Sequence, residues 1–131
     1  MMNKIMGHNL IISDSKTVAE NIDDRSYLFV DVRPAFGENP ETGDIAVRWN
    51  ILPSLVHYID TLSRYTDVVI YCSAGMDRSP FVAAVVISEK IGCELDYAYD
   101  IVLDNHPMTI RHADWRSDFI RIKRNKDGNK I

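Results

Sequence analysis

The stretch Val68-Val69-Ile70-Tyr71-Cys72-Ser73-Ala74-Gly75-Met76-Asp77-Arg78-Ser79-Pro80 decides the fold of this chain. Its first four residues are apolar, β-branched or aromatic, which is typical of a strand buried on both faces. Ser79 is a favourable N-cap and Pro80 suits the first helical position, so we expect a helix to begin there. Apolar residues then recur at helical spacing as far as Gly92, a natural helix end. The stretch predicts a strand, a loop and a helix in succession.

The loop between this strand and helix carries Cys72 and, six residues later, Arg78. A loop that wraps a helix N-terminus directs several backbone N–H groups at one point, and the helix dipole adds positive charge there. Such a place favours the thiolate form of a cysteine, and a guanidinium at its rim can grip two oxygens of a phosphate. Thiolate, anion cradle and guanidinium together indicate a cysteine-dependent phosphatase. The residues expected to hold the phosphoryl group are Ser73, Ala74, Gly75, Met76, Asp77 and Arg78.

The run Cys72-Ser-Ala-Gly-Met-Asp-Arg78-Ser79 resembles the signature of the protein tyrosine phosphatase superfamily, in its small dual-specificity branch. The family motif is usually preceded by histidine, where this chain has Tyr71. A second resemblance lies near His106-Pro107, where the family's downstream helix usually ends in Arg-Pro. The resemblance implies attack by Cys72, a phosphocysteine intermediate, and a Ser79 hydroxyl that helps the thiolate leave. It implies phosphotyrosine in proteins as substrate, with phosphoserine and phosphothreonine as further candidates, and neither metal nor organic cofactor.

A general acid must protonate the leaving oxygen. The family supplies an aspartate on a loop before the cysteine, and Asp44, in the Gly43-Asp44 turn, is the first candidate. Asp77 is the alternative, because an aspartate directly before the arginine resembles the loop of myotubularins. Against Asp77, a carboxylate in the cradle repels a phosphate dianion unless it is protonated or turned outward. Asp44 could also be a turn aspartate that only caps its own backbone, so the acid stays open between Asp44, Asp77 and neither.

The composition is that of one globular domain, residues 1–131, with 46% hydrophobic and 26% charged residues and a net charge of −4. Neither a membrane span nor a signal peptide is apparent, so we expect a cytoplasmic protein, and a monomer. Basic residues concentrate after residue 110, but a solvated helix end explains them better than a nucleic-acid partner.

Cys93 is expected to be a small buried residue or a disulfide partner of Cys72. Ligand spacing for zinc is missing, and we take the four histidines, His8, His57, His106 and His112, as ordinary.

Periodicity and punctuation predict an α/β domain with a mainly parallel sheet of four to five strands flanked by helices. Residues 33–43 contain two prolines and two glycines and are expected to form a loop. A helix over 17–22 is expected to be capped by Ser15. Strands are predicted at 9–12, 28–32, 46–51 and 68–71, and further helices at 53–65, 80–91, 95–105 and 113–123. Because ligands bind beyond the carboxyl ends of such strands, Cys72 is well placed for a site.

Other functions remain open. Leu28-Phe29-Val30-Asp31-Val32-Arg33 resembles a rhodanese strand, so a rhodanese-like sulfurtransferase or a rhodanese-fold phosphatase is an alternative. A module that binds phosphate without catalysis is another. Phosphoinositide and RNA 5′-phosphate are alternative substrates, since related enzymes use them and the basic C-terminal segment could assist their binding.

Overall fold

The computed structural model describes residues 1–128 and contains a central sheet of four strands in the order β1-β2-β6-β3. β2 (Leu10–Asp14), β6 (Asp67–Cys72) and β3 (Tyr27–Asp31) run parallel to one another, and β1 (Met2–Lys4) pairs antiparallel with β2. β6 lies between two parallel neighbours, as its continuous run of apolar residues predicts. The expected α/β class with a mainly parallel sheet is confirmed.

Side chains on the inner strands alternate between two cores, as a period of two requires. Val68, Ile70 and Cys72 of β6 belong to the main core, whereas Val69 and Tyr71 belong to a smaller cluster on the opposite face. The main core is covered by α2 (Leu52–Ser63), α3 (Arg78–Ile91) and α4 (Leu95–Asn105), and the smaller cluster by α1 (Ser15–Asn21). Helix α3 contacts the strands β2 and β6 as well as α4. Cys72 thus faces the helix whose N-terminus follows it.

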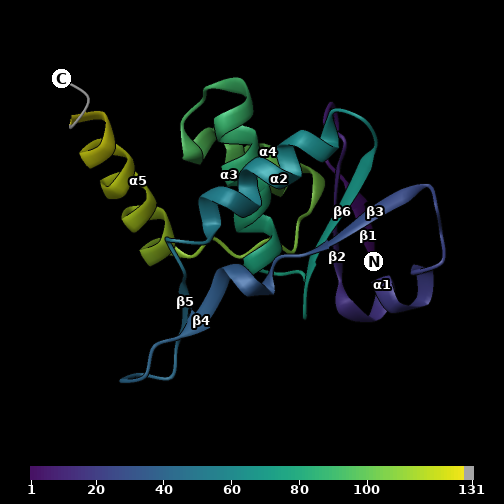
Figure 1. The fold of residues 1–131 in the computed structure, drawn as a ribbon, viewed down its shortest axis with the longest axis horizontal. Coiled ribbons are helices and arrows are strands. Elements are labelled where there is room, and N and C mark those ends of the chain that lie inside the picture. Colours follow the sequence, from purple (N-terminus) through teal and green to yellow (C-terminus); the bar gives the residue numbers. More distant parts are fainter. Residues whose placement is uncertain (129–131) are drawn as a thin grey trace.

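Helix α3 is the most buried segment of the chain. Every residue from Ser79 to Ser88 is buried, because the helix packs against both the sheet and neighbouring helices. Apolar and small residues make these packing contacts along successive turns of the helix. The C-cap of the helix is Gly92, which has a left-handed backbone conformation with a φ of +67°. The C-terminal helix α5 (Ala113–Gly128) is different, since it is largely polar and meets the body mainly through Trp115 and Phe119. In Figure 1 it extends from one side of the molecule.

The predicted strand at 46–51 is wrong in its placement. β5 (Ile45–Val47) pairs with β4 (Phe36–Glu38) in a separate two-stranded hairpin, and the central sheet does not include it. Residues 33–43, expected to be a loop, contain the short 3-10 helix η1 (Arg33–Ala35) and β4. The buried ring of Phe36 fixes the base of the hairpin against Phe81 and Trp115. Figure 1 shows the turn of the hairpin projecting away from the sheet.

Two expected helix caps are also wrong. α1 is capped by Asp14, whose side chain accepts a hydrogen bond from the Thr17 N–H at 2.8 Å, and Ser15 is its first residue. α3 begins one residue before Ser79, and its N-cap is Asp77, which accepts from the Arg78 N–H at 2.8 Å. Aspartate and serine are about equally good caps, so the choice between adjacent candidates depends on how the preceding loop approaches the helix.

Candidate active site

The Cys72 sulfur lies at the N-terminal end of α3. Its side chain is 1% exposed, and Sγ accepts a hydrogen bond from the Gly75 N–H at 3.2 Å. The Ser79 hydroxyl lies 3.3 Å from Sγ on the other side. Both groups can donate to a sulfur anion, and the positive end of the α3 dipole adds to their effect. Because Asp77 caps the helix, the Ser79 hydroxyl is free to face the sulfur.

Three carbonyl groups of the loop, those of Ser73, Gly75 and Met76, are held by residues outside it. The Ser73 carbonyl accepts from the Ser15 N–H at 3.3 Å, and the Met76 carbonyl accepts from the Ile110 N–H at 2.7 Å. The Gly75 carbonyl lies 2.6 Å from Nε2 of His106. In a tight loop, carbonyls held outward leave amides facing inward. The amides of Ser73, Ala74, Met76 and Asp77 make no hydrogen bond within residues 1–128, which leaves them available to an anion.

Gly75 makes this loop conformation possible. Its φ is +69°, a left-handed value that other residues adopt at a cost. A Cβ at this position would lie 2.8 Å from the backbone oxygen of Ser13 and 2.9 Å from Cε of Met1. The loop therefore passes directly over the end of β2, and a residue with a side chain cannot occupy position 75 without displacing main-chain atoms.

Arg78 is half-buried at the first position of α3, and its Nε is buried without a hydrogen-bond acceptor in the described chain. Asp77, directly before it, uses its carboxylate to cap the helix and so occupies the Arg78 N–H. The sequence predicts that this N–H binds the phosphoryl group, but in the structure it is already hydrogen-bonded to Asp77. The arrangement leaves the Arg78 side chain, rather than its backbone, as the donor at this end of the loop.

Asp31 and Arg33 form a second polar pair at the same edge of the sheet. Asp31 is the last residue of β3, the parallel neighbour of β6, and Arg33 begins η1 shortly after it. The Arg33 guanidinium binds both oxygens of Asp31 at 2.8–3.1 Å. Partial burial acts to raise the pKa of Asp31, but the hydrogen bonds from Arg33 outweigh it and hold that pKa below its ordinary value, with Arg78 contributing. The pKa of Arg33 is raised chiefly by Asp31, and Cys72 adds to it. Asp31 is thus an ionised acceptor near the loop.

Tyr71, which stands where the family motif has histidine, does not approach the sulfur. Alternation along β6 directs its ring to the opposite face of the sheet, among Phe29 and other residues beside α1. The Arg33 guanidinium lies 5.9 Å from the centre of the ring. The contacts of the Cys72 sulfur therefore come from Gly75 and Ser79.

Asp44 lies in the exposed turn of the β4–β5 hairpin. Its N–H donates to the Thr42 hydroxyl at 3.2 Å, and its carbonyl accepts from the Asn39 N–H at 2.8 Å. Its carboxylate makes no hydrogen bond or ion pair in the part of the chain that the structure describes. The structure brings Cys72, Ser79 and Asp77 together at the loop, and it leaves Asp44 on a projecting hairpin.

Sequence reasoning missed His106, which contacts the loop, and Asn3, which contacts His106. His106 is fully buried at the C-terminal end of α4, where it contacts both Gly75 and Asn3. The prediction of an ordinary histidine at position 106 overlooks its place before Pro107, which matches the position at which the related helix ends. Asn3 carries no local signal, since it lies 103 residues from its partner.

The two cysteines cannot form a disulfide in this fold. Cys72 precedes α3 and Cys93 follows it, and a helix of 14 residues separates its ends by about 20 Å. A disulfide requires Cα atoms within about 7 Å. Cys93 is half-buried and lines a cavity beside α5.

Two cavities, of about 400 and about 390 Å³, flank α5, and neither is lined by Cys72 or Arg78. Within residues 1–128, no three His, Cys, Asp or Glu side chains are grouped so as to hold a metal ion. In the same residues, each helix is too short or too polar to cross a bilayer.

Solved structures with the same architecture are phosphatases and phosphatase-like proteins. A mouse putative dual specificity phosphatase, complexed with zinc tungstate, superposes with a TM-score of 0.74 at 14% identity, over 98% of this chain and 90% of that one. Human DUSP28 gives 0.70 at 11% identity, over 96% and 95%. The human tyrosine phosphatase-like serine/threonine/tyrosine-interacting protein gives 0.68 at 13% identity, over 95% and 97%.

The sequence itself matches no protein-family model and no curated protein. The fold is nevertheless that of the dual-specificity and tyrosine phosphatases, because these superpositions cover nearly the whole of each chain.

Proposed function

We propose that this chain is a cysteine-dependent phosphomonoesterase that acts on phosphotyrosine in proteins through a phosphocysteine intermediate. Cys72 attacks phosphorus and the ester oxygen leaves. The loop amides and the Arg78 guanidinium hold the three remaining oxygens. Water then attacks the phosphocysteine, which releases phosphate and returns the thiolate, and the Ser79 hydroxyl stabilises that thiolate as it leaves.

One observation carries this proposal: the sulfur of Cys72 faces two donors near the start of a buried helix, in a loop that has three carbonyls held by residues outside it. A structural cysteine needs neither donors nor a ring of free amides. The buried Nε of Arg78, which has no acceptor among residues 1–128, is the type of donor that a phosphate oxygen would satisfy.

The ligand of one neighbour supports the choice of anion. The mouse protein was solved with zinc tungstate, and tungstate, like phosphate, is a tetrahedral oxyanion. Phosphotyrosine is favoured as the substrate by the phosphatases that share the fold, and phosphoserine, phosphothreonine, phosphoinositides and RNA 5′-phosphate are the alternatives for the same chemistry. Asp44 is proposed as the acid that protonates the leaving oxygen, with Asp77 as the alternative.

Sulfur transfer is a weaker alternative. The rhodanese-like run Asp31-Val32-Arg33 has a local explanation here, because Asp31 and Arg33 bind each other at the end of β3. The spacing of Cys72 and Arg78 and the solved neighbours favour phosphoryl transfer over sulfur transfer.

Hydrolysis by the wild-type protein and by Cys72→Ser tests the proposal. Substrates would be an aryl phosphate, a phosphotyrosine peptide, a phosphothreonine peptide, an inositol lipid and 5′-triphosphate RNA, with Cys93→Ser as the matched control. We expect fastest turnover of the phosphotyrosine peptide, loss of all turnover in Cys72→Ser, and binding of tungstate by both proteins in calorimetry.

Other results would reject the enzyme. Wild-type protein that binds tungstate and hydrolyses nothing would be a phosphate-recognition module. Transfer of sulfur from thiosulfate to cyanide, without phosphate release, would establish the rhodanese alternative.

A further inference from the structure

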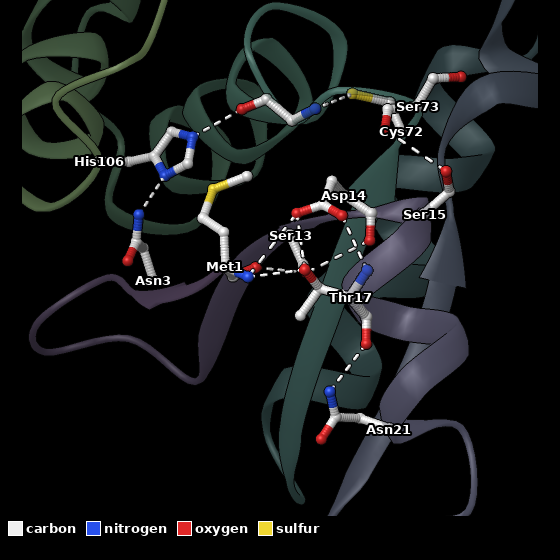
Figure 2. Close-up of polar contacts among 11 residues, drawn as sticks. Met1, Asn3, Ser13, Asp14, Ser15, Thr17, Asn21, Cys72, Ser73 and His106 are labelled. Carbon is white, nitrogen blue, oxygen red and sulfur yellow. Dashed lines mark hydrogen bonds and ion pairs between the residues drawn. The ribbon is translucent and has the colours of Figure 1, made fainter.

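We infer that Asn3 and His106 are positioning residues that fix the Gly75 peptide groups and, through them, the amide that faces the Cys72 sulfur. Four groups follow one another in a line: the Asn3 amide, the His106 imidazole, the backbone of Gly75 and Sγ of Cys72. Figure 2 shows this line of dashed contacts from β1 to the end of β6. The inference rests on the proposed function only in so far as Cys72 acts as the thiolate.

The hydrogen-bonding pattern assigns one tautomer to His106. Nε2 lies 2.6 Å from the Gly75 carbonyl, which can only accept, so Nε2 carries a hydrogen. Nδ1 lies 2.7 Å from the Asn3 amide nitrogen, which can only donate, so Nδ1 accepts. Asn3 therefore selects the neutral imidazole that donates to the loop. In general, the hydrogen bond made by one ring nitrogen of a histidine determines whether the other nitrogen carries the proton.

Gly75 needs such an anchor. Glycine moves between left- and right-handed backbone conformations at little cost, and a stiffer residue is excluded because a Cβ would meet the Ser13 oxygen at 2.8 Å. The peptide groups on the two sides of the Gly75 Cα carry the N–H that faces sulfur and the carbonyl that faces His106. Holding that carbonyl outward keeps the neighbouring N–H directed at Cys72.

The surroundings keep the His106 ring neutral. The side chain is fully buried, and burial lowers the pKa of His106 while the hydrogen bond to the Gly75 carbonyl opposes this. Within residues 1–128, no charged side chain is hydrogen-bonded or ion-paired with the ring. The charged groups around the loop are Asp77, Arg78, Asp31, Arg33 and, at the end of β2, Asp14 with the N-terminal ammonium group of Met1 3.8 Å from its carboxylate.

Two substitutions of His106 separate positioning from packing. In a Cys93→Ala background, His106→Leu removes the donor, whereas the amide of His106→Gln can place a nitrogen near the former Nε2. The readouts are the pH midpoint of thiolate ultraviolet absorbance, corrected with Cys72→Ser, and the rate of alkylation by iodoacetamide. For His106→Leu we expect a higher midpoint and about 10-fold slower alkylation at pH 6, equivalent to one lost hydrogen bond to a charged group. His106→Gln should recover most of both, and His57→Gln, at an exposed histidine, should change neither.

A folded His106→Leu protein with the wild-type midpoint and alkylation rate would overturn the inference. If His106→Leu does not fold, Asn3→Ala decides the matter, because it keeps the imidazole and removes only its orienting donor. The expected result is a smaller upward move of the midpoint, and an unchanged midpoint would again overturn the inference. Neither readout requires phosphatase activity, so the positioning role can hold even if wild-type protein hydrolyses none of the phosphate esters.

Discussion

Tyr71 and Cys72 are neighbours in one strand, yet their side chains belong to different cores. A strand presents successive side chains to opposite faces, so a substitution of the residue before the cysteine acts on the α1 side of the sheet. This explains how tyrosine can stand where the related motif has histidine. Polar support for the sulfur comes instead from the loop itself, through Gly75 and Ser79.

Asp77 and Asp44 differ in what surrounds their carboxylates. Asp77 accepts the N–H of Arg78 and is held in place as a helix cap. Asp44 is exposed in a hairpin turn. The Asp77 carboxylate is therefore already engaged by a backbone N–H, whereas the carboxylate of Asp44 makes no hydrogen bond or ion pair among residues 1–128. Asp44 stays our first candidate for the acid, and the hairpin must approach the loop for that residue to act.

The leaving group separates the two acids experimentally. For the residue that acts as the acid, replacement by asparagine should slow hydrolysis of an alkyl phosphate by about 10²–10⁴-fold. Hydrolysis of p-nitrophenyl phosphate should change little, since its leaving group needs no proton. We expect this pattern for Asp44→Asn in kcat/KM measurements. For Asp77→Asn we expect a modest loss with both substrates, through the weakened cap. The reverse pattern would transfer the role to Asp77, and no selective loss in either variant would leave the reaction without a carboxylic acid.

The loop and α3 form one unit whose conformation depends on contacts from three residues outside it. Ser15 at the start of α1, Ile110 after α4 and His106 at the end of α4 each hold one carbonyl of the loop. These anchors orient the amides before any anion binds, so binding need not order the loop. Preorganisation of donors is the main source of electrostatic stabilisation in sites of this kind.

Substitution of Gly75 by alanine tests this unit. Gly75→Ala forces a side chain into the left-handed region and against the Ser13 oxygen, so we expect destabilisation of at least about 1–2 kcal/mol and loss of most activity. Gly92→Ala is the matched control, because Gly92 has nearly the same φ but no atom within 4 Å of the added Cβ. Gly92→Ala should be destabilised by a similar amount, because alanine is also strained at a positive φ, and it should retain activity. Urea denaturation and aryl phosphate hydrolysis measure both, and equal activity of the two variants would contradict the proposed loop geometry.

Trp115 joins segments that are far apart in the chain. Its ring lies 5.1 Å from Phe36 at the base of the hairpin and 5.5 Å from Phe81 on α3, and it stacks on His112 at 3.9 Å. The hairpin, the central helix and the start of α5 therefore share one aromatic cluster. This cluster, rather than an extension of the sheet, fixes the position of the β4–β5 hairpin.

Removal of this ring should weaken the whole fold. Trp115 is 3% exposed, and truncation of a buried aromatic residue to alanine costs about 3–5 kcal/mol. We expect that loss in the free energy of unfolding of Trp115→Ala, measured by urea denaturation monitored by circular dichroism. Tyr65→Ala, at a side chain that is 84% exposed, should stay within about 0.5 kcal/mol of wild type. A loss below about 1 kcal/mol for Trp115→Ala would show that the cluster is not part of the cooperative core.

The sequence alone was sufficient to predict the α/β class, the strand–loop–helix at Cys72 and the approximate helix bounds, because these depend on local periodicity and on residues within a few positions of one another. Tertiary structure decided the rest. Three features depend on which segments meet in the folded chain. They are the pairing of Ile45–Val47 with Phe36–Glu38, the choice of Asp77 over Ser79 as the cap of α3, and the contact of Asn3 with His106. A linear pattern does not specify such meetings, because they are set by how the two faces of the sheet are covered and by where the ends of its strands come together.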